Sequence, residues 1–239
     1  CIRDRFITAL LMAAPVCGGL KIKIKGDLIS KPYVDLTVKL IEKFGAVVSR
    51  NGYSEFTVEG TGYTSPGSYL IEGDATGATY FAAAAAIGGE LELYGLPEDS
   101  VQGDIKFLDV LAQMGAKIKK TESSVIIKKS KLHGIDIDMN AMPDAAMTLV
   151  PLALYTDGPI TIRNIASWRV KETDRIEAMV KEMSKLGVKV ESGEDYISID
   201  ASTRNDVTPT FDTYNDHRMA MCMSCLLYTS PSPRDRSLS

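Results

Sequence analysis

A unit of about seventy residues recurs along this chain, and the repeat limits the possible folds more than any other feature of the sequence. Three amphipathic segments end at Gly45, Gly115 and Gly187, which are spaced 70 and 72 residues apart. Apolar side chains recur three and four positions apart in each segment, as in a helix with one buried face. Glycine readily takes the left-handed conformation that ends such a helix. Each segment is therefore predicted to be a surface helix that stops at its glycine.

A strand, a polar turn and a second strand are predicted after each of these glycines. The segments alternate polar and apolar side chains, which is the period of a half-buried strand. The predicted pairs are 46–49 with 55–59, 116–119 with 124–128, and 188–191 with 196–200. Further strands are predicted at 20–25, 90–94 and 159–165. Each unit therefore ends in a β-hairpin.

The sequence also predicts a second kind of helix, which is rich in alanine and methionine and apolar on most sides. One such helix precedes each of the strands at 20–25, 90–94 and 159–165, and one more opens a further copy of the unit. The segments are 6–14, 75–87, 145–155 and 217–225. Helices without a polar face are buried. Asp74, Asp144 and Asp216 precede the last three, where a carboxylate can cap free backbone N–H groups. The order predicted for one unit is helix, strand, helix, strand, strand.

Copies related by rotation about one axis would direct the N-termini of their buried helices to one end of the domain. Helix dipoles and free N–H groups at that end attract anions, so the loops entering these helices are the place to search for functional residues. The net charge of −4 excludes a protein whose main partner is nucleic acid, and any bound anion must meet a local basic cluster. No apolar stretch reaches the roughly 18 to 20 residues that cross a bilayer.

Four cysteines without a disulfide framework indicate a reduced, cytoplasmic protein. Cys222 and Cys225 form a C-x-x-C motif, but no second pair of ligands completes a zinc site, so both are interpreted as apolar core residues. His133 and Trp168 have no evident chemical partner in the sequence and are interpreted as structural.

The segment from Trp168 to Arg175 places three cations and two acids within eight positions. Lys171 and Arg175 are four residues apart, so on a helix they share a face and could clamp a phosphate or a carboxylate. Glu172 lies beside that anion as a candidate proton donor. A solvated, charged helix start is the alternative interpretation of the same pattern.

Three further segments bring polar side chains to the starts of predicted helices. His217 and Arg218 open one buried helix, where an anion site and a simple cap are equally supported. Asp144 opens another, and a plain N-cap remains the alternative there. Ser30 and Tyr33 stand at the mouth of a surface helix, which taken alone is an ordinary helix start.

Taken together, these segments resemble the 5-enolpyruvylshikimate-3-phosphate (EPSP) synthases of the bacterial type, members of the enolpyruvyl transferase family. The resemblance covers about 220 residues and rests on five motifs in order: Ser30–Tyr33, Glu72–Asp74, Pro143–Met147, Trp168–Arg175 and Asn215–Met221. It implies an α/β fold in which repeated βαβαββ units form inverse α/β barrel (prism-like) domains with buried parallel helices. Residues 6–72 would end a first domain and residues 73–225 would form part of a second. Residues 1–5 and 226–239 are predicted to be non-native sequence.

The resemblance also implies a reaction in the shikimate pathway to chorismate and the aromatic amino acids. The enolpyruvyl group of phosphoenolpyruvate passes to the 5-hydroxyl of shikimate 3-phosphate, and phosphate is released without a metal or a cofactor. Asp144 would accept the proton of the attacking hydroxyl, and Glu172 would protonate the methylene carbon of phosphoenolpyruvate.

The implied ligands fall into two sets. Those of shikimate 3-phosphate are Ser30, Tyr33, Asp144, Ser167 and Lys171, and those of phosphoenolpyruvate are Glu172, Arg175, His217 and Arg218. Ser167 stands where the family usually has asparagine, and Arg3-Asp4-Arg5 stands where a Ser-Ser-Gln-like phosphate loop belongs.

The expected protein is a cytoplasmic monomer that binds these two metabolites and neither membrane nor nucleic acid. The chain on its own is expected not to turn over, because the terminal cations of the family's site are absent from it. Two alternatives stay open at this point: a UDP-N-acetylglucosamine enolpyruvyl transferase, and a non-catalytic scaffold that binds anions.

Overall fold

The chain divides into two compact units, which are described one at a time. The computed structural model describes residues 2–26, 28, 31–97, 100–121 and 123–224, and the side chains of residues 2–5 are not described. The first unit comprises Cys1–Glu72 and Asp99–Gly103, and the second comprises Gly73–Glu98 and Asp104–Ser239.

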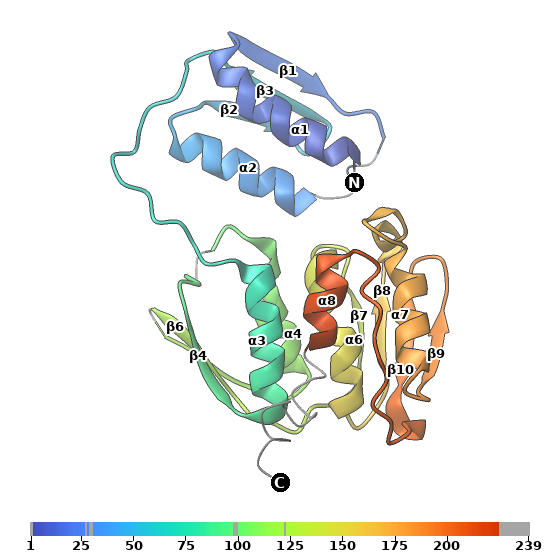
Figure 1. The fold of residues 1–239 in the computed structure, drawn as a ribbon. Helices are drawn as coiled ribbons and strands as arrows, with labels where there is room; N and C mark the ends of the chain where they lie inside the picture. The colour runs from blue at the N-terminus through green and yellow to red at the C-terminus, as the bar shows by residue number, and fades with distance from the viewer. Residues whose placement is uncertain (1, 27, 29–30, 98–99, 122, 225–239) are drawn as a thin grey trace. The chain divides into compact units, whose positions relative to one another are not determined.

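The first unit is a three-stranded antiparallel sheet with two helices packed against it (Figure 1). Its elements are α1 (Ile2–Ala13), η1 (Ala14–Val16), β1 (Gly19–Lys23), α2 (Lys31–Lys43), β2 (Val48–Asn51) and β3 (Glu55–Glu59). The strand order is β1-β3-β2. Leu11, Val34 and Phe56 are fully buried and bring both helices and the sheet into one small core.

The second unit contains two sheets. The first is β4 (Glu90–Tyr94), β6 (Ser124–Lys128) and β5 (Lys117–Lys120) in that order, and the second is β7 (Ile135–Asp138), β8 (Ile160–Arg163), β10 (Ile197–Asp200) and β9 (Lys189–Ser192). The helices are α3 (Ala75–Gly88), η2 (Gly103–Lys106), α4 (Phe107–Gln113), α5 (Pro143–Ala146), α6 (Leu149–Leu152), η3 (Ala153–Tyr155), η4 (Ala166–Val170), α7 (Arg175–Ser184), η5 (Ala201–Thr203) and α8 (His217–Ser224). Figure 1 shows α3, α8 and α6 side by side between the two sheets.

The predicted repeat is confirmed in the pairing of the strands. In the three sheets, β1, β4 and β8 pair antiparallel with β3, β6 and β10. These in turn pair antiparallel with β2, β5 and β9. The observed strand ends lie within two residues of the predicted ones. Gly45, Gly115 and Gly187 have φ values of 82°, 98° and 71°, so the surface helices α2, α4 and α7 end at left-handed glycines as expected.

One strand was not predicted. Residues Ile135–Asp138 form β7, which runs parallel to β8 with Ile135 opposite Ile160. With β7 included, residues 135–200 contain one complete βαβαββ unit, in which α5 and α6 make the first crossover and α7 the second. The strand alternates Ile and Asp over only four residues, and so short a pattern is a weak signal.

The predicted buried helix at 145–155 is wrong as a single helix. It is divided into α5, α6 and η3, and the N–H groups of Thr148 and Val150 reach back only three residues, to the carbonyls of Ala145 and Met147. Pro151 has no N–H with which to continue an α-helical ladder, so the segment tightens into short turns. It nevertheless remains buried, since Leu149, Val150 and Leu152 are at most 1% exposed.

The prediction for 6–14 needs two corrections. The helix α1 begins at Ile2, four residues before the predicted start. It is also not buried on all sides, because Phe6 is 64% exposed and Leu10 44% exposed. In this unit α1 packs against α2 and lies over the sheet (Figure 1). None of the described helices is long and apolar enough to cross a membrane.

Substitution of two glycines in the second unit by alanine distinguishes the energetic cost of a strained backbone from that of a steric clash. A methyl group added at Gly95 (φ 77°) would meet no atom nearer than 3.6 Å, whereas one added at Gly115 (φ 98°) would come within 3.0 Å of the Lys131 carbonyl oxygen and of the His133 ring. Gly95→Ala should lower the free energy of unfolding by about 1 to 2 kcal/mol, the cost of a left-handed alanine. Gly115→Ala should cost more than Gly95→Ala. Urea unfolding followed by Trp168 fluorescence measures both, and equal losses would contradict the account.

Candidate active site

Arg175, the first residue of α7, is a buried cation enclosed by carboxylates, and its side chain is 1% exposed. Its Nε donates to Asp216 Oδ2 at 2.8 Å, and its Nη1 donates to Asp144 Oδ1 at 2.9 Å. Its Nη2 donates to Glu172 Oε2 at 2.9 Å and to Asp216 Oδ1 at 3.2 Å. Three acidic residues from three separate segments therefore meet at one planar guanidinium, whose fixed donors set their positions.

Asp144 is shared by three cations. Its Oδ1 lies 3.3 Å from Lys171 Nζ and 2.9 Å from Arg175 Nη1, and its Oδ2 lies 3.2 Å from Arg218 Nη2. Burial would raise the pKa of Asp144, but the charges of Arg218, Lys171 and Arg175 outweigh it and hold that pKa below its ordinary value. Asp144 is therefore an ionised carboxylate at neutral pH.

Asp216 connects this cluster to the start of α8. Its Oδ1 accepts hydrogen bonds from the backbone N–H groups of Arg218 at 2.8 Å and Met219 at 3.4 Å, which confirms the predicted cap. Burial acts to raise the pKa of Asp216, but the hydrogen bonds and charge of Arg175 and the two backbone N–H groups lower it overall. The same carboxylate therefore fixes both a helix start and the guanidinium.

The starts of α5, α7 and α8 converge at this cluster. Asp144 lies in the first turn of α5, Arg175 opens α7, and Arg218 lies in the first turn of α8. Convergence was predicted for the buried helices, and the Arg218 to Asp144 ion pair confirms it for α5 and α8. Asp144 does not occupy the predicted cap position: the N-cap of α5 is Met142, Asp144 lies in the first turn, and its oxygens contact three cations.

The first turns of α3 border the same region. Burial raises the pKa of Tyr80 to about 12, although the nearby charge of Arg218 acts to lower it. Thr76 donates its hydroxyl to Asp104. Burial, and secondarily the charge of Asp144, raises the pKa of Asp104 despite that hydrogen bond. The pKa values of Asp104 and Asp144 are thus shifted in opposite directions. The sequence patterns identified neither Asp104 nor Tyr80 as a site residue.

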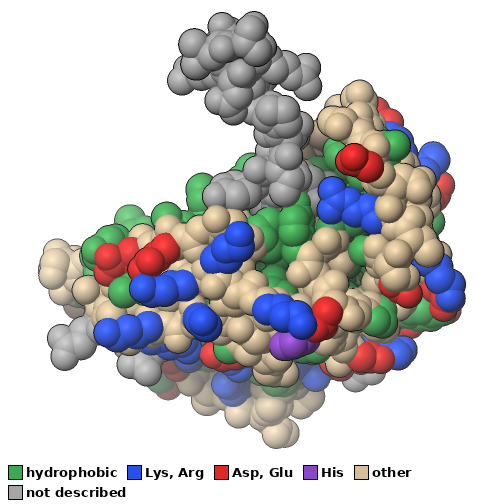
Figure 2. Space-filling view, turned by 90° about the horizontal axis from the view of Figure 1, so that it is seen from below, with side chains coloured by type: hydrophobic (Ala, Val, Ile, Leu, Met, Phe, Trp, Pro, Cys, Tyr) green, Lys and Arg blue, Asp and Glu red, His purple; other side chains and the backbone are tan. Residues whose placement is uncertain are grey.

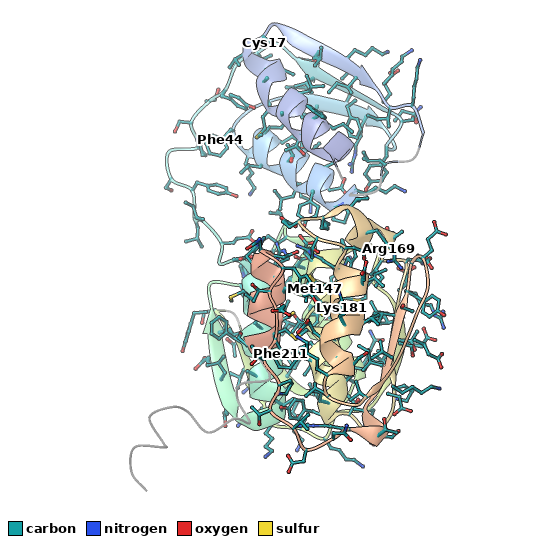
Figure 3. All side chains as sticks on the ribbon, turned by 45° about the vertical axis from the view of Figure 1, so that its right-hand side comes forward. Cys17, Phe44, Met147, Arg169, Lys181 and Phe211 are labelled. Atoms are coloured by element: carbon teal, nitrogen blue, oxygen red, sulfur yellow. The ribbon has the colours of Figure 1, made fainter. Side chains whose placement is uncertain are left out.

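Trp168 has a partner that the sequence did not reveal. Its ring is fully buried, and its Nε1 donates to the carbonyl oxygen of Pro143 at 2.7 Å, one residue before Asp144. Arg169 on the same short helix η4 binds Asp174 and the carbonyl groups of Gly193 and Glu194. Figure 3 labels Arg169 on the second unit. These contacts hold the loop that carries Lys171 and Glu172.

The structure does not bring every predicted site residue into the cluster. Ser167 is half-buried on η4, and His217 is exposed at the start of α8, next to Arg218. Tyr33 lies on α2 in the first unit, and Ser30 lies outside the described residues.

The remaining sequence interpretations concern cysteine and histidine. Cys222 is buried in the core of the second unit, whereas Cys225 lies outside the described residues. His133 pairs with Asp157 at 2.9 Å on the surface. Within the described ranges there is no group of three or more His, Cys, Asp or Glu side chains that could hold a metal ion. On the face seen in Figure 2, basic side chains lie among acidic and apolar ones.

The cluster is electrically balanced among the side chains described. Three cations, Lys171, Arg175 and Arg218, face three carboxylates, Asp144, Glu172 and Asp216. An anionic ligand that used the Arg175 guanidinium would have to replace one of the carboxylates that its N–H groups now bind. Glu172 is the carboxylate best placed to leave, because its side chain is 37% exposed whereas those of Asp144 and Asp216 are nearly buried.

Comparison with known proteins identifies the family of this chain. The model of the family described as EPSP synthase (3-phosphoshikimate 1-carboxyvinyltransferase) matches residues 4–228. This chain belongs to the EPSP synthase family. The 3-phosphoshikimate 1-carboxyvinyltransferases of Shewanella piezotolerans and Aeromonas salmonicida are 51% identical over 230 residues and 49% identical over 225 residues. These matches cover 95% and 93% of this chain but 54% and 52% of the two relatives.

Solved structures support the fold. An EPSP synthase from Acinetobacter baumannii matches 87% of this chain and 50% of its own, with a TM-score of 0.66 and 23% identity. The enolpyruvyl transferase NikO from Streptomyces tendae matches 92% of this chain and 50% of its own, with a TM-score of 0.63 and 19% identity. The expected α/β fold of the EPSP synthase family, built from βαβαββ units, is confirmed. The chain spans about half the length of the relatives that it matches.

Removing the guanidinium tests how strongly the cluster depends on it. Arg175→Gln leaves Asp216 buried without its main partner and removes one of the three cations at Asp144, so at pH 7 it should lower the free energy of unfolding by about 3 to 5 kcal/mol. The lowered pKa values of both carboxylates stabilise the wild type above pH 4, and this stabilisation is lost as the pH falls through the folded values. In the variant both carboxylates protonate more readily in the folded state. The difference in stability should therefore shrink as the pH falls from about 5 to 3.

Urea unfolding between pH 3.5 and pH 7 measures this difference. Arg163→Gln is the matched control, because Arg163 pairs with Asp136 at 2.6 Å on the exposed surface, where an ion pair contributes little. A loss at Arg175 no larger than that at Arg163, or a difference that does not change with pH, would contradict the account.

Proposed function

We propose that this chain is part of an enzyme that transfers the enolpyruvyl group of phosphoenolpyruvate to the 5-hydroxyl of shikimate 3-phosphate and releases phosphate. The observation that carries the proposal is the ionised Asp144 among three cations, beside the more exposed Glu172, where three helix starts converge. Membership of the EPSP synthase family and the printed names of relatives about half identical to this chain support the same reaction.

Asp144 suits the role of general base. Its pKa is held below the ordinary value, so it is ionised and can accept the proton of the 5-hydroxyl as that oxygen bonds to C2 of phosphoenolpyruvate. Lys171, 3.3 Å from Asp144, would lie beside the shikimate 3-phosphate that this base deprotonates. Ser30, Tyr33 and Ser167 are proposed as further ligands of that substrate.

Glu172 is proposed as the general acid. It would give a proton to the methylene carbon as the new C–O bond forms, which leaves a tetrahedral adduct. A proton then leaves the resulting methyl group for Glu172 as the bond to phosphate breaks, and the proton held by Asp144 passes to the departing phosphate, so both residues return to their starting states. When Glu172 turns from Arg175 toward the substrate, an N–H of the guanidinium becomes available to an anion.

Arg175 and Arg218 are proposed to bind phosphoenolpyruvate, with His217 beside them. A guanidinium binds a carboxylate or phosphate through paired N–H donors, and the converging helix starts add favourable dipoles. We further propose that the complete enzyme acts as a monomer in the cytoplasm, with residues 6–72 in one domain and 73–225 in the other. We also propose that the 239 residues alone do not catalyse the reaction.

Substrate choice is the first test. The complete reading frame that contains this chain should release phosphate from phosphoenolpyruvate only when shikimate 3-phosphate is present. A phosphate-release assay with shikimate 3-phosphate, with UDP-N-acetylglucosamine and without an acceptor measures this. Release with the UDP-sugar would assign the other enolpyruvyl transferase reaction, and failure to release phosphate with either acceptor would leave only a binding scaffold.

Two isosteric substitutions test the proton transfers. Asp144→Asn and Glu172→Gln keep the shape of each side chain and remove one acid, so kcat should fall by about a hundredfold or more. The Kd of phosphoenolpyruvate, measured by calorimetry, should change far less than kcat. Glu177→Gln, on the exposed face of α7, is the control and should leave kcat unchanged. Unchanged turnover in either site variant would remove that residue from the mechanism.

A further inference from the structure

Glu182 is a fully buried carboxylate outside the cluster described above. It lies on α7, seven residues after Arg175 and so on the same face of the helix. Its Oε1 accepts the hydroxyl of Tyr214 at 2.7 Å, and its Oε2 accepts the backbone N–H of Asp212 at 3.0 Å and Lys185 Nζ at 2.8 Å. Burying a charge is costly unless it is paired and hydrogen-bonded, and here it is both.

The segment that Glu182 binds has a strained backbone. Tyr214 and Asn215 have φ values of 54° and 55°, which is left-handed backbone in two consecutive non-glycine residues. Asparagine tolerates this region, but for a bulky tyrosine it is unusual, and the cost is about 1 to 2 kcal/mol. Such strain persists only where surrounding contacts over-determine the conformation.

The strained turn leads directly into the site. The backbone N–H of Asp216 donates to the Thr213 carbonyl at 2.8 Å and closes the turn. Asp216 then holds Arg175, and Arg218 reaches Asp144. The direction of both side chains therefore depends on whether this turn keeps its left-handed form.

Lys185 also binds the segment that precedes the strained turn. Its Nζ donates to the Thr210 carbonyl at 3.0 Å and lies 3.2 Å from Asp212 Oδ2, besides its bond to Glu182. Phe211, labelled in Figure 3, packs against the core of the second unit between these contacts. The chain before the turn is thus fixed to the last turns of α7, the helix whose first residue is Arg175.

We propose that the hydrogen bond from Tyr214 to Glu182 is a latch that holds the left-handed turn, and thereby positions Asp216 and Arg218 for the anionic substrate. Neither latch residue touches the reacting groups, so both are positioning residues. The kinetic consequence rests on the proposed function, whereas the structural consequence does not.

Hydrogen exchange in the 239-residue chain tests the structural part. Tyr214→Phe removes the hydroxyl and keeps the ring, so the amides of Asp216, Arg218 and Met219 should exchange at least tenfold faster. Amides at the centre of α7 should keep their wild-type rates. Tyr94→Phe, on the exposed strand β4, is the matched control and should change none of them. Exchange within twofold of wild type at all three amides would overturn the proposal.

Glu182→Gln is a second variant that keeps the size of the acceptor side chain. The Tyr214 hydroxyl and the Asp212 N–H bond different oxygens of Glu182, and glutamine offers an oxygen at only one of these two places. One of the two contacts is therefore lost, and exchange at Asp216 and Arg218 should increase in the same direction. Exchange at wild-type rates in this variant would also count against the latch.

Steady-state kinetics of the complete enzyme test the positioning role. Tyr214→Phe should raise the KM for phosphoenolpyruvate at least fivefold and change the KM for shikimate 3-phosphate by less than twofold. A merely structural role would lower the active fraction, and therefore the apparent kcat, without moving either KM, and that result would overturn the proposal. A wild-type enzyme without phosphate release would refute the proposed function, and the exchange rates would still decide the latch.

Discussion

The buried guanidinium of Arg175 is the contact on which the arrangement of the second unit's charged residues depends. It joins the start of α7 to Asp144 on α5 and to Asp216 before α8, so one planar group sets the relative positions of three helix starts. The energetic reason is that neither charge can be left alone in the interior: each carboxylate is costly without the cation, and the cation is costly without the carboxylates. The same balance leaves Glu172, the more exposed partner, as the acid that can move.

Much of the scaffold could be predicted from the sequence because its signals are local and repeated. Gly45, Gly115 and Gly187 each end a helix in the left-handed conformation, and a hairpin follows each of them. The alternating strands and the Asp74 and Asp216 caps depend on neighbouring residues only. The charged segment from Trp168 to Arg175 was identified by its density of cations and acids, and its Lys171 and Arg175 do meet at Asp144. The prediction that these two residues share one helix face is wrong, because η4 ends at Val170 and α7 begins at Arg175, so Lys171 lies in the loop between them.

What the sequence did not reveal depends on contacts between distant segments. The Trp168 indole binds the carbonyl of Pro143, and Glu182 binds Tyr214 across about thirty residues of chain, and no local pattern reports either contact. Asp144 looked like a cap because a carboxylate before a helix usually is one, but three nearby cations compete for its oxygens. Pro151 is a local signal that divides the helix at 145–155, and the apolar pattern around it concealed that effect.

We propose that the cluster at the converging helix starts is an anion site at which Glu172 gives way to the ligand. The most direct measurement is an NMR titration of the ¹⁵N-labelled 239-residue chain with phosphoenolpyruvate, followed at the arginine Nε–H signals. We expect saturable shifts at Arg175 and Arg218 and none at the exposed Arg163. Shifts confined to Arg163, or no saturable shift at Arg175 and Arg218, would contradict it.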